Sequence, residues 1–190
     1  DAMKVTTTNI DGVLLLEPKV FGDARGFFME SFNQKTFDEA VGHHVRFVQD
    51  NHSRSARGVL RGLHFQLPPH AQGKLVQVSQ GAVFDVVVDV RLGSASFGHC
   101  FAVELSGENH KQVWMPPGMA HGFLVLSESA DFQYKTTDYY APQAERSLSW
   151  RDPELAIAWP DTGAAPVLSA KDSAAPSLAA AVRRAAVSRA

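Results

Sequence analysis

The chain consists of many short apolar segments, each ended by Gly, Pro or Asn, and this feature limits its fold most strongly. The segments are rich in Val, Leu and Phe, which favour strands, and the residues between them are typical of turns. Their number and spacing predict an all-β chain folded as a barrel or sandwich. The candidate strands are GVLLLEPKVFGD, RGFFMESF, VRFVQDNHS, GVLRGLHFQ, KLVQVSQG, AVFDVVVDVR, GHCFAVELS, KQVWMPPG, AHGFLVLSES and DFQYKTTDYY.

The segment AVFDVVVDVR has the side-chain alternation of a strand between two different environments. Its even-numbered residues from Phe84 to Val90 are all apolar, and they share one face because side chains alternate along a strand. The odd-numbered residues on the other face include Asp85, Asp89 and Arg91. One face of this strand is therefore expected to be apolar and the other partly polar.

Length and pattern indicate one domain. A chain of 190 residues, of which 45% are hydrophobic, can bury one sizeable core, so we expect a single domain over residues 3–190. Helical signals are weak: NQKTFDEAVG predicts one short helix ended by Gly42. The Ala-rich segment 173–190 predicts a helical or frayed extension, with Pro176 before the helix.

Charge and cysteine content narrow the environment and the partners. Lys and Arg number 18 against 20 Asp and Glu, so we expect no basic surface for nucleic acid. Cys100 is the single cysteine, and its apolar neighbours indicate an inert core thiol in a reducing compartment. The first residues lack the features of a signal peptide, and no apolar run is long enough to cross a bilayer. We therefore expect a cytoplasmic protein without a membrane partner.

The stretch RGLHFQLPPHAQGKL, residues 61–75, contains an arginine, two histidines and a lysine but no acid. A half-buried segment with such an excess of positive charge is costly unless an opposite charge is supplied. We therefore expect a bound ligand to bring negative charge to this part of the chain.

Two histidine segments resemble the paired motifs of the cupin superfamily, small β-barrels that hold ligands inside the barrel. Gly58 and His64 match the first motif, and His121 matches the second. Metal-binding cupins have a second histidine where this chain has Gln66, and a Glu that is missing here before Gly81. Because two histidines alone make a poor metal site, we expect a metal-free barrel.

Several motifs together resemble one enzyme family, the dTDP-4-dehydrorhamnose 3,5-epimerases (RmlC). The resemblance runs from about Gly12 to Asp172, and the motifs agree in order and spacing. It implies a cupin-type β-barrel (jelly roll) with few short helices that works as a homodimer without metal or organic cofactor. The implied reaction converts dTDP-4-dehydro-6-deoxy-D-glucose into dTDP-4-dehydro-L-rhamnose, in dTDP-L-rhamnose biosynthesis. The motifs are RGLHFQ, KLVQV, GAVFDVVVDVR, FGHCFAVELS, MPPGMAHGFLVLSE, YKTTDYYAP and LSAKD.

The implied chemistry removes and returns protons at C3 and C5, and the C4 ketone stabilises each carbanion as an enolate. The base needs a pKa near neutrality, which histidine has. The resemblance implies that His64 is this base, and that Tyr134 is the acid on the opposite face of the sugar. It also implies Lys74 at the enolate oxygen and Asp172 beside His64. The residues alone leave Asp85 open as another partner for His64.

The remaining family positions concern the nucleotide sugar. Guanidinium groups suit phosphate oxygens, so Arg61 and Arg25 are expected at the diphosphate. In the family, Arg25 and Glu30 match residues that reach across the dimer, so that each site contains parts of two chains. Tyr140 is expected to stack on thymine. The other implied substrate-binding residues are Gln49, Asn51, His121, Glu145 and Lys171.

Two alternatives stay open at this point. The first is an epimerase or ketoisomerase that acts at a single centre of a related dTDP-deoxysugar, and the presence of both His64 and Tyr134 favours double epimerisation over it. The second is a cupin that binds a sugar nucleotide without any chemistry. Such a protein needs only the arginines and the aromatic residue, whereas this chain also carries an acid, a base and a group for the oxyanion.

Overall fold

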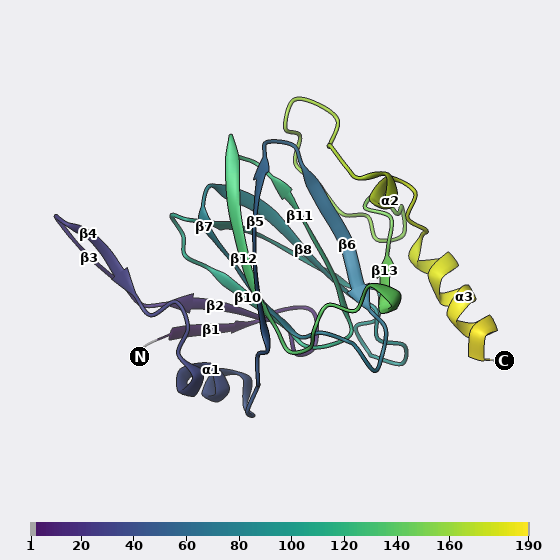
Figure 1. Cartoon of the computed structure of the whole chain (residues 1–190), viewed down its shortest axis with the longest axis horizontal. Helices are drawn as coiled ribbons and strands as arrows, with labels where there is room; N and C mark the ends of the chain where they lie inside the picture. Colours follow the sequence, from purple (N-terminus) through teal and green to yellow (C-terminus); the bar gives the residue numbers. More distant parts are fainter. Residues whose placement is uncertain (1–2, 190) are drawn as a thin grey trace.

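Two antiparallel sheets that face each other form the body of the protein (Figure 1). The computed structural model describes residues 3–189, with side chains described as far as residue 183. The first sheet contains, in spatial order, β1 (Met3–Thr7), β2 (Leu14–Pro18), β10 (Gln112–Met115), β7 (Lys74–Gln80), β12 (Ser129–Thr136) and β5 (Gln49–Ala56). The second contains β13 (Glu145–Ser147), β6 (Leu60–Gln66), β11 (Met119–Val125), β8 (Ala82–Asp89) and β9 (Cys100–Ser106).

The remaining elements lie around this body. A two-stranded hairpin, β3 (Val20–Asp23) and β4 (Gly26–Met29), projects away from the two sheets (Figure 1). The helices are α1 (Gln34–Val41), the 3-10 turn η1 (Pro142–Ala144), α2 (Ala170–Ser173) and α3 (Leu178–Arg189). The predicted all-β fold with few short helices is confirmed. No helix in residues 3–189 is long and apolar enough to cross a membrane.

The central core lies between the two sheets, because both contribute to it. Phe132 and Val76 come from the first sheet, and Val87 and Leu105 from the second. The predicted alternation in β8 is confirmed, since Asp85 and Val87 face inward while Val86 and Val88 pack in a separate outer cluster. That outer cluster is covered by the C-terminal part of the chain, so the strand is buried on both faces.

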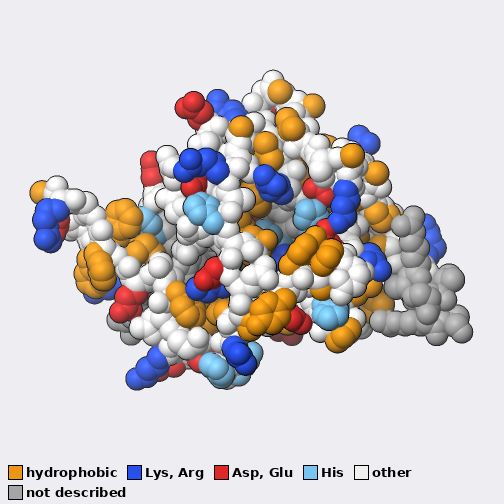
Figure 2. All heavy atoms as spheres, in the orientation of Figure 1, with side chains coloured by type: hydrophobic (Ala, Val, Ile, Leu, Met, Phe, Trp, Pro, Cys, Tyr) orange, Lys and Arg blue, Asp and Glu red, His pale blue; other side chains and the backbone are white. Residues whose placement is uncertain are grey.

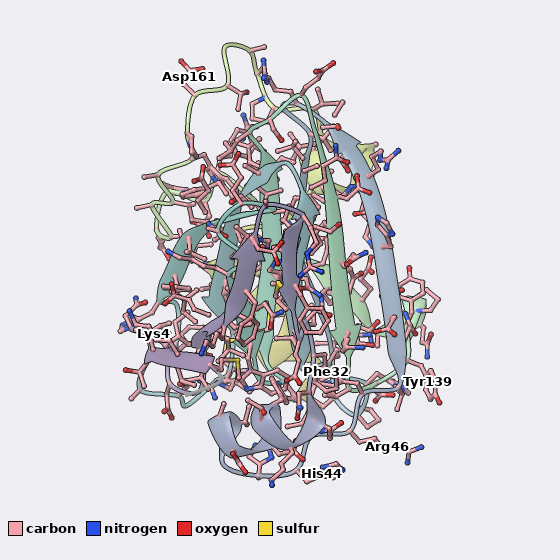
Figure 3. All side chains as sticks on the ribbon, turned by 90° about the vertical axis from the view of Figure 1, so that its left-hand side faces the viewer. Lys4, Phe32, His44, Arg46, Tyr139 and Asp161 are labelled. Atoms are coloured by element: carbon pink, nitrogen blue, oxygen red, sulfur yellow. The ribbon has the colours of Figure 1, made fainter. Side chains whose placement is uncertain are left out.

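Helix α1 forms where the sequence predicts it and closes one end of the barrel. The side chain of Asn33 accepts a hydrogen bond from Thr36 N at the N-terminus, and Gly42 ends the helix with a φ of 93°. Phe37 on the buried face of the helix packs in an aromatic cluster with Phe32 and Trp114. Figure 3 shows Phe32 between α1 and the sheets.

The C-terminal extension is helical and docked at its start. Leu178 is buried in the outer cluster, and its N–H donates to Asp152 Oδ2 at 2.8 Å. Ala190, the last residue of the expected extension, lies outside the described residues. The short elements β1, β13 and α2 were not predicted, because three to five mostly polar residues carry no periodic signal.

Candidate active site

Side chains from both sheets meet in two adjoining cavities between the sheets. The cavities have volumes of about 210 and 610 Å³ and share four lining residues. Asn51, Lys74 and Tyr134 come from the first sheet, whereas His64 comes from the second. Figure 2 shows histidine, lysine and arginine side chains gathered around a recess in this face of the molecule. Ionisable groups therefore face one space from opposite walls.

His64 on β6 is held by a carboxylate from a distant part of the chain. Its Nε2 lies 2.5 Å from Asp172 Oδ1, and Asp172 Oδ2 accepts from Gly62 N at 3.1 Å. Asp172 is 4% exposed and stands in the first turn of α2, which Ser169 caps. Burial alone would raise the pKa of Asp172, but the hydrogen bonds from His64, Gly62 and Ser169 outweigh it and lower that pKa. The carboxylate is thus ionised beside the imidazole.

Each of the two histidines at the cavity has a carboxylate partner of its own. His121 is opposite His64 in the register of β11 and β6, and its Nε2 lies 2.6 Å from Asp85 Oδ1. Asp85 is fully buried, and its Oδ2 has no hydrogen-bond partner among the described residues. Asp172 therefore pairs with His64, and Asp85 with His121, so the site contains two imidazole–carboxylate pairs.

Lys74 opens β7 as a buried ammonium. It is 9% exposed, and its Nζ lies 5.5 Å from the centre of the Tyr134 ring. Burial lowers the pKa of Lys74 to about 8, and the charges of Glu145 and Asp85 oppose part of that shift. A lysine with this pKa still carries its charge at neutral pH, and it faces the same space as His64.

Tyr134 on β12 is half-buried and belongs to the sheet opposite that of His64. Burial raises the pKa of Tyr134, a hydrogen bond from Asn51 opposes the shift, and the net direction is upward. The phenol therefore keeps its proton at neutral pH and can donate it. Phe132, stacked on Phe123 with ring centres 4.2 Å apart, forms an apolar part of the same cavity wall.

The predicted nucleotide-binding residues lie around the mouth of the cavities. The smaller cavity is lined by Gln49, Asn51, Tyr140 and Glu145, and the larger by Arg61. Several of these side chains are already engaged within the protein. Gln49 Nε2 donates to Asn51 Oδ1 at 3.1 Å, Arg61 Nε donates to Ser55 Oγ at 2.9 Å, and Lys171 pairs with Glu145.

Arg25 and Glu30 do not join this group within one chain. Arg25 sits in the turn of the projecting hairpin, exposed and bound to Asp23 by Nη2 to Oδ2 at 2.6 Å. Glu30 lines a separate groove beside Phe28 and Phe32. The single chain thus brings together every predicted site residue except these two.

Some residues of the site escaped the sequence analysis. Ser169 caps the helix that carries Asp172, and the spacing Ser-x-x-Asp is the pattern of an N-terminal helix cap, which could have revealed it. Gln66 was noticed only as a missing metal ligand, yet its side chain binds three backbone groups at the cavity. Phe123 and Phe132 looked like ordinary strand residues and carried no signal.

The fold and the site together define an acid–base enzyme on a double-sheet barrel of the cupin type. A base, a phenol and a buried ammonium around one cavity suit proton transfer next to a carbonyl group. In residues 3–189 no group of three or more His, Cys, Asp or Glu side chains is arranged to hold a metal ion.

Comparison with known proteins identifies the family. The family model described as dTDP-4-dehydrorhamnose 3,5-epimerase matches residues 7–180. The enzyme of that name from Pseudomonas aeruginosa is 61% identical over 170 residues, which cover 90% of this chain and 93% of the relative. The solved epimerase RmlC from Legionella pneumophila is 56% identical with a TM-score of 0.89, and covers 93% of both chains. The chain therefore belongs to the dTDP-4-dehydrorhamnose 3,5-epimerase family, which confirms the predicted cupin fold, isomerase class and place in dTDP-L-rhamnose biosynthesis.

A further solved structure is relevant to specificity. ChmJ from Streptomyces bikiniensis, a 3'-monoepimerase in complex with dTDP-quinovose, is 39% identical with a TM-score of 0.88, and the match covers 94% of this chain and 89% of that chain. A double mutant of ChmJ replaces a histidine and a tyrosine with the same spacing as His64 and Tyr134. The presence of these two residues is therefore not sufficient to distinguish double from single epimerisation.

Proposed function

We propose that this chain inverts C3 and C5 of dTDP-4-dehydro-6-deoxy-D-glucose, with His64 as the base and Tyr134 as the acid. The observation that carries the proposal is the placement of the two groups on opposite sheets, both facing the same cavity. Inversion requires a proton to leave from one face of the sugar and another to arrive from the opposite face. A base and an acid on facing walls fulfil that requirement for a ring bound between them.

Each inversion proceeds in two proton transfers. His64 removes the proton from the carbon next to the ketone through Nδ1, because Nε2 is engaged by Asp172. The electron pair of the broken C–H bond moves to the C4 oxygen, where the ammonium of Lys74 stabilises the enolate. Tyr134 then donates its proton to the same carbon from the other face. The tyrosine recovers a proton from solvent and His64 releases one, so the enzyme is restored.

The nucleotide part of the substrate occupies the mouth of the site. Arg61 binds the diphosphate, Tyr140 stacks on thymine, and Asn51 hydrogen-bonds the nucleotide. The ligands of two relatives support this assignment. The Legionella structure contains dTDP-4-keto-L-rhamnose, and a Bacillus anthracis relative, 47% identical, contains TDP and PPi. The remaining contacts come from Gln49, His121, Glu145 and Lys171.

The hairpin β3–β4 completes the site of a second copy of this chain. Its Phe21, Phe27 and Phe28 are 54%, 62% and 67% exposed, which is unusual for three neighbouring aromatic residues of a stable fold. A homodimer would cover these rings and would bring Arg25 and Glu30 to the partner's cavity. A measurement of mass in solution tests the dimer, and a monomer at micromolar concentration would contradict it.

Deuterium exchange tests the reaction. The enzyme is incubated with its substrate in D₂O, and NMR follows the isotope at C3 and C5 together with the configuration of the product. Incorporation at both carbons with formation of dTDP-4-dehydro-L-rhamnose is expected. The absence of any exchange would contradict the proposal.

A second candidate function is epimerisation at C3 alone. The similarity to the 3'-monoepimerase ChmJ favours it, because that protein shares the fold over 94% of this chain. The same NMR experiment separates the two functions. Exchange confined to C3 would establish the single epimerisation and exclude the double one.

A further inference from the structure

Gln66 is a buried polar side chain at the cavity for which the proposed chemistry gives no role. It is 6% exposed, it lines the smaller cavity, and it occupies the position at which metal-binding cupins have a histidine. We propose that Gln66 is a positioning residue for the nucleotide base, because it holds the backbone around Tyr140. This inference rests on the proposed stacking of Tyr140 on thymine.

The amide of Gln66 joins two loops at the mouth of the cavity. Its Nε2 donates to His70 O at 2.7 Å, in the loop before β7. The same nitrogen donates to Tyr139 O at 3.2 Å, and Oε1 accepts from Ala141 N at 2.9 Å, both in the loop after β12. The carbonyl group on one side of Tyr140 and the N–H group on the other side are therefore bound to one side chain.

The backbone of Tyr140 is hydrogen-bonded to a second glutamine side chain, that of Gln49. Its N–H donates to Gln49 Oε1 at 3.0 Å. Three successive residues, Tyr139 to Ala141, are thus held by side-chain amides in a segment that lies between β12 and η1. Tyr139 points away from the sheets (Figure 3), and Tyr140 is 56% exposed. Because more than half of Tyr140 is exposed, the direction of its side chain depends on the tethered backbone more than on packing.

Only a glutamine meets the demands of this position. An amide supplies two N–H donors and one carbonyl acceptor, and all three groups make a hydrogen bond here. A glutamate would oppose a negative charge to two carbonyl oxygens, and a methionine of similar length would make none of the bonds. An asparagine keeps the amide but is one methylene shorter, so it cannot reach both loops.

An aromatic ring that is already in place binds a base better than one on a loose loop. Ordering a loop on binding costs conformational entropy, and that cost is subtracted from the affinity. Loss of Gln66 should therefore weaken binding of the base, while the diphosphate site at Arg61, on the other cavity, should be unaffected.

A double-mutant cycle tests the inference. Calorimetry measures the binding of dTDP and, separately, of inorganic pyrophosphate to the wild type, Gln66→Met, Tyr140→Ala and the double variant. Gln66→Met should weaken dTDP binding about tenfold, which is within the range for lost base stacking, and change pyrophosphate binding less than about twofold. In the Tyr140→Ala background the same substitution should weaken dTDP binding no further, because its effect passes through Tyr140. In kinetics, KM should rise while kcat stays within about twofold.

Several outcomes would overturn the positioning role. Additive losses in the double variant would mean that Gln66 contacts the ligand directly or supports the fold generally. If Gln66→Met weakened pyrophosphate binding as much as dTDP binding, Gln66 would not act through the base site alone, and the inference would fail. If Gln66→Met does not fold, Gln66→Asn replaces it, and wild-type affinity for dTDP in that variant would contradict the inference. If Tyr140→Ala binds dTDP as tightly as the wild type, the stacking and the positioning role both fail. Deuterium exchange by the wild-type enzyme tests the proposed reaction independently of these results.

Discussion

At the scale of single residues, the site depends on groups whose ionisation is set by their neighbours. The clearest case is the pair of His64 and Asp172, in which one oxygen of the carboxylate binds the imidazole and the other binds Gly62 N. A carboxylate held in this way fixes the orientation of the imidazole and stabilises the imidazolium that forms when the base accepts a proton.

Replacement of Asp172 should therefore slow the chemical step. Asp172→Asn keeps the shape but removes the charge, and we expect kcat to fall about 100-fold or more while KM changes little. Steady-state kinetics on the nucleotide sugar measures both values. Asp152→Asn is a control for the loss of a buried carboxylate, since Asp152 accepts hydrogen bonds from Leu178 N and Glu154 N and lines neither cavity. A fall in kcat as large in the control as in Asp172→Asn would contradict a role for Asp172 in the reaction.

The pH dependence of kcat/KM should reveal the loss of the proton from the buried Lys74. Burial lowers the pKa of Lys74 to about 8, and in the proposed mechanism only its protonated form stabilises the enolate. On the alkaline side of its optimum, kcat/KM should therefore fall as the pH rises through about 8. Lys74→Arg carries a guanidinium that stays charged, so any residual activity should lose this decline. An unchanged decline near pH 8 in the arginine variant would mean that another group titrates.

At the scale of elements, the contact between β6 and β11 sets the positions of His64 and His121. Gly62 has a φ of 125°, and a Cβ atom there would lie 2.6 Å from Gly122 Cα and 2.7 Å from His121 O. The two strands can approach this closely only because neither has a side chain at that point. The short distance allows the two histidines to share one wall of the cavity.

A methyl group at this contact should push the strands apart. Gly62→Ala is expected to lower the free energy of unfolding by roughly 2–4 kcal/mol and to reduce activity more than stability alone explains. Gly163→Ala is a matched control, because Gly163 also has a positive φ of 91° but nothing lies within 4 Å of its added Cβ atom. We expect the control to cost about 1 kcal/mol in urea unfolding and to keep full activity. Equal effects of the two variants would contradict the role of the contact.

The elements differed in how far the sequence predicted them. The strands with alternating or continuous apolar residues and the helix between Asn33 and Gly42 were predicted, because periodicity and capping are local signals. The strand β13 and the single turn of α2 were not, since their positions depend on contacts with β6 that are distant in sequence. For the same reason the residues alone could not decide between Asp85 and Asp172 as the partner of His64.

At the scale of the whole molecule, the sequence predicted which residues belong to the site but not how they are arranged in space. The family motifs named His64, Lys74 and Tyr134, and the structure brings all three to one cavity. Nothing in the sequence indicated that His64 and Tyr134 belong to different sheets, because this follows from the strand order. Arg25 is distant from the cavity of its own chain, so its predicted role remains a prediction that depends on a second copy.

A mixed dimer tests that role. An Arg25→Ala chain and a His64→Ala chain are each expected to have low activity, but a mixed dimer has one site with an intact histidine from one chain and an intact arginine from the other. Random mixing in equal amounts should restore about a quarter of the wild-type activity, since half of the dimers are mixed and each has one complete site. No recovery on mixing would mean that Arg25 does not act on the partner's site.

The central claim is that His64 and Tyr134 act on opposite faces of one bound sugar, and the variant Tyr134→Phe tests it most directly in D₂O. The base remains in this variant while the acid is lost. We predict that NMR will show continued incorporation of deuterium next to the ketone, with formation of the inverted product reduced about 100-fold, whereas His64→Asn abolishes both. Normal inversion by Tyr134→Phe, or exchange that survives in His64→Asn, would contradict the account.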